Sequence, residues 1–246
     1  YARLRQLNPA PFAAYLNTPG MQVLSASPER FLALRDGQVE TRPIKGTAPR
    51  AREPARDRAL AARLAASEKD RAENLMIVDL LRNDLGRCCE TGSVQVPELF
   101  AVESYAGVHH LVSSVTARLR TDADAASLLR ACLPGGSITG APKIRAMQII
   151  DQLEGAPRGV YCGSIGYIGY DGAMDTNIAI RTASVADGHL DFRAGGGLVA
   201  DSECDAEWAE IGLKARAMLE LAAALGADVD GVCGGDAAPV RTRGAR

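Results

Sequence analysis

The acidic side chains near the C-terminal end of the 246-residue sequence are spaced as one face of a helix. Glu203, Glu207 and Glu210 fall at i, i+4 and i+7, and Lys214 follows one turn later. A helix would therefore present all four side chains together. They could form a solvated charged face that contains a Glu-to-Lys pair, or they could hold a ligand.

Asp70 and Glu73 form a second acidic pair, at i and i+3, directly before the apolar run 75–78. Two helices that each offer carboxylates at one-turn spacing could hold a hard divalent cation such as Mg²⁺. This ion takes one or two protein oxygens and keeps several waters. Solvation at the surface is the alternative for this pair as well.

Two glycine-rich segments are candidates for anion binding. In the run 194–197 the missing side chains would let backbone N–H groups approach an anion, although a plain loop fits the same residues. The segment 135–140 has the spacing of a phosphate-binding loop, but Ala141 and Pro142 stand where that motif requires Lys and Ser or Thr. The sequence therefore gives no nucleotide-binding fingerprint.

Helices and strands alternate irregularly around these residues. The pattern predicts helices over 54–85, 124–133, 143–153 and 203–225, the last with Ser202 and Asp205 as a capping box. It predicts strands within 23–42 and over 94–97, 111–119, 160–170, 174–185 and 190–194, with a turn over 43–47. Strands joined mainly by hairpins indicate an α+β fold with a large antiparallel sheet and not a TIM barrel.

Composition limits the classes of partner. The 28 basic and 30 acidic residues give a formal charge of -2, which supplies no field for a nucleic acid or an anionic membrane. The six cysteines include no C-x-x-C pair, and we interpret them as reduced. No run approaches the roughly 20 apolar residues of a membrane helix, so we expect a cytoplasmic protein. The segment 226–246 lacks periodicity and predicts a disordered tail.

Several long motifs stand in register with those of a known family. They are Ser27-Pro28-Glu29-Arg30-Phe31, Arg42-Pro43-Ile44-Lys45-Gly46-Thr47, the run 70–84 and the run 136–143. In this order they resemble the signatures of chorismate-utilising enzymes, which include anthranilate, aminodeoxychorismate, isochorismate and salicylate synthases. The likeness spans about residues 8–221. It implies a chorismate-binding catalytic domain over 1–225 that lacks the N-terminal region of the usual fold.

Lys45 distinguishes branches of that family. The segment resembles the aminodeoxychorismate synthases, which carry lysine before the glycine where anthranilate synthases usually carry alanine. The resemblance implies that Lys45 attacks the chorismate ring as the C4 hydroxyl leaves, and that ammonia then displaces the enzyme. A lysine attacks only as the free amine, so desolvation or nearby positive charge must lower its pKa. Solvation of a surface lysine is the alternative.

Glu29 and His110 are the other implied catalytic residues. Glu29 resembles the general acid that protonates the departing hydroxyl, for which burial or a second carboxylate must raise its pKa. It could instead pair with Arg30 or Arg42 at the surface. His110 resembles the family histidine that orients the substrate near C4, although a histidine at a strand edge is often structural.

Chorismate carries two carboxylates, and the resemblance implies how the site neutralises them. Mg²⁺ held by Glu73 and Glu210, with Asp70 and Glu207 nearby, would take the ring carboxylate. The implied substrate contacts are Thr139, Tyr161, Arg181, Gly195, Gly197 and Lys214. Thr139 and Ser137 could instead cap the following helix.

The resemblance also implies a partner. In the family, ammonia comes from a separate or fused glutamine amidotransferase, and this sequence shows no cysteine nucleophile motif of that kind. The implied function is amination of chorismate at C4 to 4-amino-4-deoxychorismate, on the way to p-aminobenzoate and folate. Anthranilate synthase component I, or a truncated non-catalytic subunit that binds a glutaminase, remain alternatives.

Overall fold

The computed structural model describes residues 1–105 and 107–226, and the predicted tail lies outside them from residue 227 onward. The chain forms two compact units. One comprises 1–29, 148–165 and 177–246 and is called here the four-stranded unit; the other comprises 30–147 and 166–176 and is called the seven-stranded unit. Both units combine helices with antiparallel strand pairs, which confirms the predicted α+β class.

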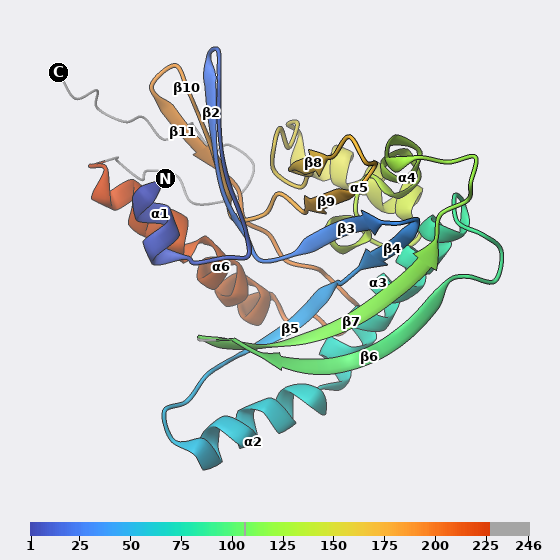
Figure 1. The fold of residues 1–246 in the computed structure, drawn as a ribbon. Helices are drawn as coiled ribbons and strands as arrows, with labels where there is room; N and C mark the ends of the chain where they lie inside the picture. The colour runs from blue at the N-terminus through green and yellow to red at the C-terminus, as the bar shows by residue number, and fades with distance from the viewer. Residues whose placement is uncertain (106, 227–246) are drawn as a thin grey trace. The chain divides into compact units, whose positions relative to one another are not determined.

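The seven-stranded unit is built on one long strand, β7 (Val108–Arg118). One edge of β7 pairs first with β5 (Ile44–Pro49) and then with β4 (Gln38–Thr41), while its other edge pairs with β6 (Gln95–Ser104). The sheet continues through β3 (Arg30–Arg35) and β9 (Met174–Asn177) to β8 (Gly166–Ile168). Figure 1 shows β6 and β7 as a long curved pair.

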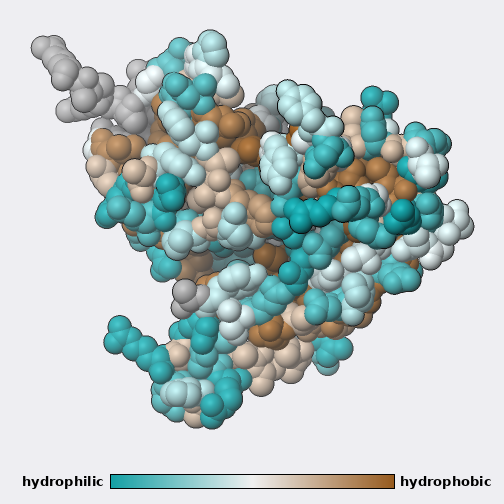
Figure 2. Space-filling model, viewed as in Figure 1, coloured by the Kyte–Doolittle hydropathy of each residue, from teal (hydrophilic) through white to brown (hydrophobic). Residues whose placement is uncertain are grey.

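The helices of this unit differ from the prediction in one respect. The predicted helix over 54–85 is two helices, α2 (Pro54–Ala65) and α3 (Glu68–Gly86). Ser67 ends the continuity because its hydroxyl accepts a hydrogen bond from the backbone N–H of Asp70, and so caps α3. α3 packs against β7 and β5, whereas α2 buries only Leu64 and leaves a hydrophilic surface (Figure 2).

The segment between β7 and β8 carries the second glycine-rich motif, residues 135–140. It contains α4 (Ala125–Cys132), the 3-10 helix η1 (Gly136–Ile138) and α5 (Lys143–Glu154). The predicted helix over 124–133 is confirmed, with the carboxylate of Asp124 capping its first turn through the N–H of Ser127. α4 and η1 both pack against α3.

The four-stranded unit has the strand order β1 (Phe12–Thr18), β2 (Met21–Ser27), β10 (Thr182–Ala186), β11 (His189–Phe192). Helix α1 (Ala2–Leu7) packs against the long helix α6 (Cys204–Ala224). Leu24 and Ala183 from the sheet meet Leu4, Met218 and Leu221 from the two helices in one apolar core. Because one face of α6 packs into this core, the opposite face of the helix points away from it.

Two predicted strands and one predicted cap are wrong. Residues 160–165 form turns that precede the short β8, and the single strand predicted over 174–185 is split into β9 and β10, which belong to different sheets. The capping box is absent because Ser202 donates its hydroxyl to Glu207 while α6 begins after Glu203 without a side-chain cap. Among the described residues, no helix has the length and apolar character needed to cross a membrane.

Candidate functional site

Lys45 lies in strand β5 and not in the turn that the sequence predicts. The register of β5 against β7 shifts between Ile44 and Thr47, so Lys45 and Gly46 form an irregular step within the strand. The Nζ atom of Lys45 donates a hydrogen bond to the carbonyl oxygen of Ser137 at 3.1 Å, and its side chain is part-buried. The amine is therefore held at a defined position beside the second glycine-rich motif.

Gly46 explains why Asp70 lies next to the strand that carries Lys45. Its φ is +89°, and a Cβ built on it would stand 2.9 Å from both Cβ and Cγ of Asp70. A side chain at position 46 would therefore push the first turn of α3 away from β5. One turn further along α3, Glu73 is largely buried and pairs with Lys69 at 3.8 Å. Sequence reasoning singled out both carboxylates, and the structure brings Asp70 against the lysine strand.

His110 and Thr139 lie in the same unit, and both already have local partners. The Nδ1 atom of His110, a buried residue of β7, lies 2.9 Å from the hydroxyl of Thr47, its register partner on β5. Thr139 donates its hydroxyl to the carbonyl of Gly135 at 2.9 Å, which closes the turn around η1. The alternative that Thr139 caps the following helix is therefore wrong.

The first glycine-rich run, in the four-stranded unit, lies close to two predicted side chains. A Cβ on Gly195 would stand 3.0 Å from the Tyr161 hydroxyl, and one on Gly196 would stand 3.4 Å from an Oε atom of Glu207. The absence of side chains here lets the tyrosine and the carboxylate approach the backbone. Burial raises the pKa of Tyr161 above its ordinary value, so its hydroxyl remains protonated even in alkaline solution.

The acidic face of α6 meets this run. Glu207 is 4% exposed and accepts a hydrogen bond from Ser202 at 2.7 Å. Lys214 pairs with Glu210 at 2.7 Å and donates to the carbonyl oxygen of Gly195 at 3.3 Å. The predicted common face of α6 is thus confirmed for Glu207, Glu210 and Lys214. The contact of Gly195 with Lys214 uses the Gly195 carbonyl oxygen, whereas the sequence directs attention to the N–H groups of this run.

Arg181 is a partly buried cation in the same unit. Its guanidinium donates to the side-chain oxygen of Asn8 at 3.4 Å, and it has no carboxylate partner within the described part of the chain. Burial lowers the pKa of this guanidinium from its ordinary value, since no neighbouring anion compensates for the lost hydration. A site with this property favours an anionic ligand.

Glu29 ends the segment that follows β2. It is 6% exposed, and its backbone is fixed by Ser27, whose hydroxyl accepts the Glu29 N–H at 3.3 Å, and by the N–H of Ile178, which donates to the Glu29 carbonyl at 3.1 Å. Arg30 and Arg42 pair with other carboxylates, namely Glu40, Asp175, Glu98 and Glu103. Glu29 itself is buried and does not lie at the surface. Burial is the condition that a neutral general acid requires.

Sequence reasoning missed a lysine that braces the second glycine-rich motif. Lys143 Nζ donates to the buried carboxylate of Asp84 at 2.5 Å and to the carbonyls of Cys132 and Pro134 at 3.0 and 2.8 Å. Burial raises the pKa of Asp84, and the lysine opposes that shift. The signal was present, because Lys143 closes the motif that begins at Gly136.

A second missed network joins α2 to the β6–β7 pair. Asp57 accepts hydrogen bonds from the Arg50 guanidinium at 2.8 to 3.0 Å, and its Oδ1 lies 3.1 Å from Nε2 of His109. Nδ1 of His109 lies 2.7 Å from the hydroxyl of Ser104. His109 is buried, so this network is structural support directly beside His110.

The carboxylate pairs are chemically suited to Mg²⁺. Each helix supplies two carboxylates at one-turn spacing, Asp70 with Glu73 and Glu207 with Glu210. Mg²⁺ needs only one or two such protein ligands, because waters and substrate oxygens complete its shell. Within the ranges that the structure covers, no three His, Cys, Asp or Glu side chains gather closely enough to hold a metal ion.

Comparison with known proteins identifies the family. Residues 1–220 match the chorismate binding enzymes. The chain belongs to that family. It is 59% identical over 210 residues to aminodeoxychorismate synthase component 1 of Klebsiella aerogenes, covering 85% of this chain and 47% of that protein. It is 48% identical over 220 residues to anthranilate synthase component 1 of Aquifex aeolicus, covering 89% of this chain and 44% of that protein.

The family fold is also seen in solved structures. Anthranilate synthase component I from Streptococcus pneumoniae matches with a TM-score of 0.77 and 42% identity, over 87% of this chain and 47% of that one. The chain thus spans about half the length of each of these three relatives. The predicted family and the chorismate-binding fold are both confirmed.

Proposed function

We propose that this chain carries the chorismate-aminating centre of an aminodeoxychorismate synthase. The reaction is chorismate plus ammonia to 4-amino-4-deoxychorismate plus water, which supplies p-aminobenzoate and folate synthesis. The proposal rests on the position of Lys45. Its amine is part-buried and donates a hydrogen bond to the Ser137 carbonyl, and the strand that carries it is the one that Asp70 approaches. The 59% identity to a protein of that name supports it.

In this proposal Lys45 is the nucleophile. A neutral amine can donate one hydrogen to the Ser137 carbonyl while its lone pair forms a bond to the chorismate ring. The ring electrons shift, the C4–O bond breaks, and the proton of Glu29 makes the leaving hydroxyl water. Ammonia then forms the C4–N bond and releases the lysine, while the proton that ammonia loses returns to Glu29. His110 orients the substrate near C4.

Recognition of the dianionic substrate is assigned to the remaining residues. Arg181 suits a carboxylate because its guanidinium is desolvated without an acidic partner among the described residues. Tyr161, Thr139, Lys214 and the backbone of Gly195 and Gly197 would add polar contacts. Glu73 and Glu210, with Asp70 and Glu207 nearby, would hold Mg²⁺, which supplies an electrophile for the ring carboxylate.

A glutamine amidotransferase subunit or domain is the proposed source of ammonia. The name of the Klebsiella aerogenes relative, a component 1, supports the existence of a second component. In its absence an ammonium salt should replace glutamine, since the chemistry at C4 needs only ammonia.

The test is product analysis with the purified protein, chorismate, Mg²⁺ and ammonium chloride. Addition of aminodeoxychorismate lyase should yield p-aminobenzoate, and Lys45→Ala should abolish it. Anthranilate, which is fluorescent, would instead support the anthranilate synthase alternative, favoured by the 48% identity to the Aquifex aeolicus protein. No turnover together with retained binding of a glutaminase would support a non-catalytic subunit. Wild-type rates in Lys45→Ala would remove the nucleophile assignment.

A further inference from the structure

The carbonyl group that accepts the hydrogen bond from Lys45 belongs to the segment between two helices, α4 and α5. This segment runs over 132–143, from the last residue of α4 to the first residue of α5. It contains Ser137, whose carbonyl oxygen lies 3.1 Å from the Lys45 amine. Lys45, the 132–143 segment and α3 all belong to the seven-stranded unit. The position of the amine therefore depends on the position of this segment.

The two ends of the 132–143 segment are joined by the side chain of Lys143. Its ammonium group donates hydrogen bonds to the carbonyl oxygens of Cys132 at 3.0 Å and Pro134 at 2.8 Å. The third hydrogen bond goes to the carboxylate of Asp84 on α3, at 2.5 Å. The Lys143 and Asp84 side chains are only 13% and 2% exposed. An ammonium group has three donors, so all three connect the segment with one point on α3.

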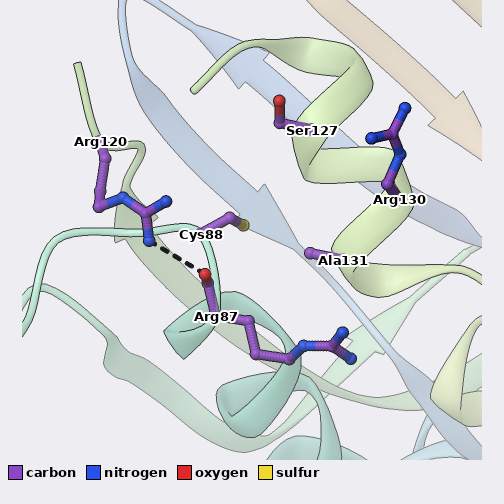
Figure 3. Close-up of a pocket in the computed structure, with 6 residues that line it drawn as sticks. All are labelled: Arg87, Cys88, Arg120, Ser127, Arg130 and Ala131. Atoms are coloured by element: carbon purple, nitrogen blue, oxygen red, sulfur yellow. Dashed lines mark hydrogen bonds between the residues drawn. The ribbon is translucent and has the colours of Figure 1, made fainter. Parts of the chain in front are cut away.

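Asp84 is a firm anchor because the end of α3 is itself fixed. The carbonyl of Arg87, directly after the helix, accepts a hydrogen bond from the Arg120 guanidinium at 3.0 Å. Figure 3 shows this bond beside a cavity that the two arginines line together with α4. α4 also packs against α3. Burial raises the pKa of Asp84, and among its neighbours Lys143 opposes that change most. Each member of the buried pair therefore needs the other.

The middle of the segment is pressed against the same helix. A Cβ built on Gly136 would stand 3.0 Å from Cδ2 and 3.2 Å from Cγ of Leu80, so the backbone of η1 lies directly on α3. The hydroxyl of Thr139 closes the following turn onto the Gly135 carbonyl at 2.9 Å. Ser137 stands between these two fixed points. The path from Asp84 to the Lys45 amine thus consists of hydrogen bonds and close packing at every step.

We propose that Asp84 and Lys143 are positioning residues for Lys45, acting through the Ser137 carbonyl. The buried pair sets where this carbonyl stands, and the carbonyl sets where the amine stands. This inference rests on the proposed function, in which the Lys45 amine attacks the chorismate ring. Misplacement of a reacting group by about 1 Å can lower a rate on the order of 100-fold. A pair that only stabilised the fold would change the amount of folded protein and leave the kcat of the folded fraction unchanged.

The first experiment compares Asp84→Asn, Lys143→Met and the double variant by urea denaturation and by kcat for ammonium-dependent amination. Each single variant leaves one buried charge without its partner, whereas the double variant removes both charges and should regain part of the lost unfolding free energy. Its kcat should stay low, up to about 100-fold below wild type, because the segment is still not braced. Asp79→Asn, at an exposed ion pair on α3, is the control and should keep the wild-type kcat. A kcat that recovers together with stability would overturn the proposal.

The second experiment needs no turnover. Trace acetic anhydride labels the lysines of the folded protein, and mass spectrometry gives the acetylation rate of Lys45 relative to Lys69 on the surface of α3. Asp84→Asn and the double variant should raise this ratio, because the Lys45 amine loses its carbonyl partner, and Asp79→Asn should not. An unchanged ratio would overturn the positioning role even in a protein that aminates chorismate. A raised ratio in a protein that makes no aminated product would support the positioning role and count against the proposed amination.

Discussion

A partly buried guanidinium without a carboxylate partner loses hydration that a neutral hydrogen-bond acceptor restores only in part. Arg181 is in this condition, with Asn8 as its side-chain partner and a pKa lowered by burial. Such a cation destabilises the unliganded protein and stabilises a complex with an anion. Substitution of Arg181 therefore distinguishes a binding role from a structural role, because the two roles predict opposite changes in the free energy of unfolding.

We expect Arg181→Met to weaken chorismate binding and to leave the free energy of unfolding unchanged or higher. Loss of one charge-assisted hydrogen bond is worth about 1.5 to 3 kcal/mol, which is roughly a 10- to 100-fold loss in affinity. Isothermal calorimetry and urea denaturation measure the two quantities. Arg216→Met, an exposed arginine of α6, is the control and should change neither. A destabilised Arg181→Met protein with normal affinity would show that the arginine is structural.

Gly46 makes a second prediction at the scale of a single residue. Gly46→Ala should destabilise the protein more than Gly20→Ala, although both glycines have a similar positive φ, +89° and +84°. Left-handed backbone costs an alanine about 1 to 2 kcal/mol at either position, but only at Gly46 would the new Cβ meet Asp70, adding about 1 to 3 kcal/mol for the crowding. Urea denaturation of both variants measures the difference. Equal losses of unfolding free energy in the two variants would show that the first turn of α3 moves away from the new Cβ at little cost.

At the scale of the elements, Asp57 ties α2 to the segment that follows β5 and to His109 on β7. The hydrogen bond from Arg50 is the largest cause that lowers the pKa of Asp57, followed by the backbone N–H of Ala51. A carboxyl group with a lowered folded-state pKa contributes stability above its unfolded pKa of about 3.9. That contribution is lost as pH falls through the lowered value.

We therefore expect the unfolding free energy of the wild-type protein to fall with acidification below about pH 4 partly through Asp57. Asp57→Asn should be less stable than wild type at pH 7 and should lose less stability between pH 5 and pH 2. Denaturation at a series of pH values measures both slopes. Asp79→Asn is a suitable control, since Asp79 pairs with Arg82 at an exposed position on α3. Parallel pH profiles for wild type and Asp57→Asn would contradict the assignment.

Local chemistry explains which elements could be predicted from sequence. The Asp124 cap depends on neighbouring residues, and the helix that it begins occurs where the pattern predicts one. The division of 174–185 into two strands does not depend on neighbouring residues. The Asn177 side chain donates to the Phe12 carbonyl and the Ile178 N–H donates to the Glu29 carbonyl, and both acceptors are more than a hundred residues away in sequence. Such long-range bonds leave no periodicity in a single sequence. The break between α2 and α3 at Ser67 could have been predicted, since a serine followed by acidic residues is a helix-start signal.

The candidate site was predictable to a similar degree. Residue types and the family motifs indicated Lys45, Asp70, Glu73 and the acidic face of α6. The approach of Asp70 to Gly46, or of Tyr161 to Gly195, depends on tertiary packing and could not be read from spacing. The lack of an acidic partner for Arg181 in the described residues likewise emerges only when the strands are paired. Sequence thus indicated the chemistry, and the fold supplied the neighbours.

At the scale of the whole molecule, the proposed residues are distributed over both units. Lys45, Asp70, Glu73, His110 and Thr139 belong to the seven-stranded unit, and Glu29, Tyr161, Arg181, Gly195, Gly197, Glu207, Glu210 and Lys214 belong to the four-stranded unit. If one chorismate and one Mg²⁺ engage both sets, then ligand should stabilise both units at the same time. A ligand used by only one set would stabilise only that unit.

Hydrogen exchange of backbone amides tests this prediction. Chorismate with Mg²⁺ should slow exchange in β5 and the first turns of α3, and equally in the run 193–197 and the first half of α6. If one ion is held by both sets, Glu73→Gln should remove the Mg²⁺-dependent protection in both units, although Glu73 belongs to only one of them.

Glu210→Gln should have the same effect from the other unit, whereas Glu220→Gln, an exposed residue of the same helix, should preserve protection. The pair of variants is decisive because a ligand held by both carboxylates would carry the effect of either substitution to the other unit. Loss of protection confined to the unit that carries the substitution would mean that the two acidic pairs serve separate ligands, and the single magnesium-bound substrate would have to be abandoned.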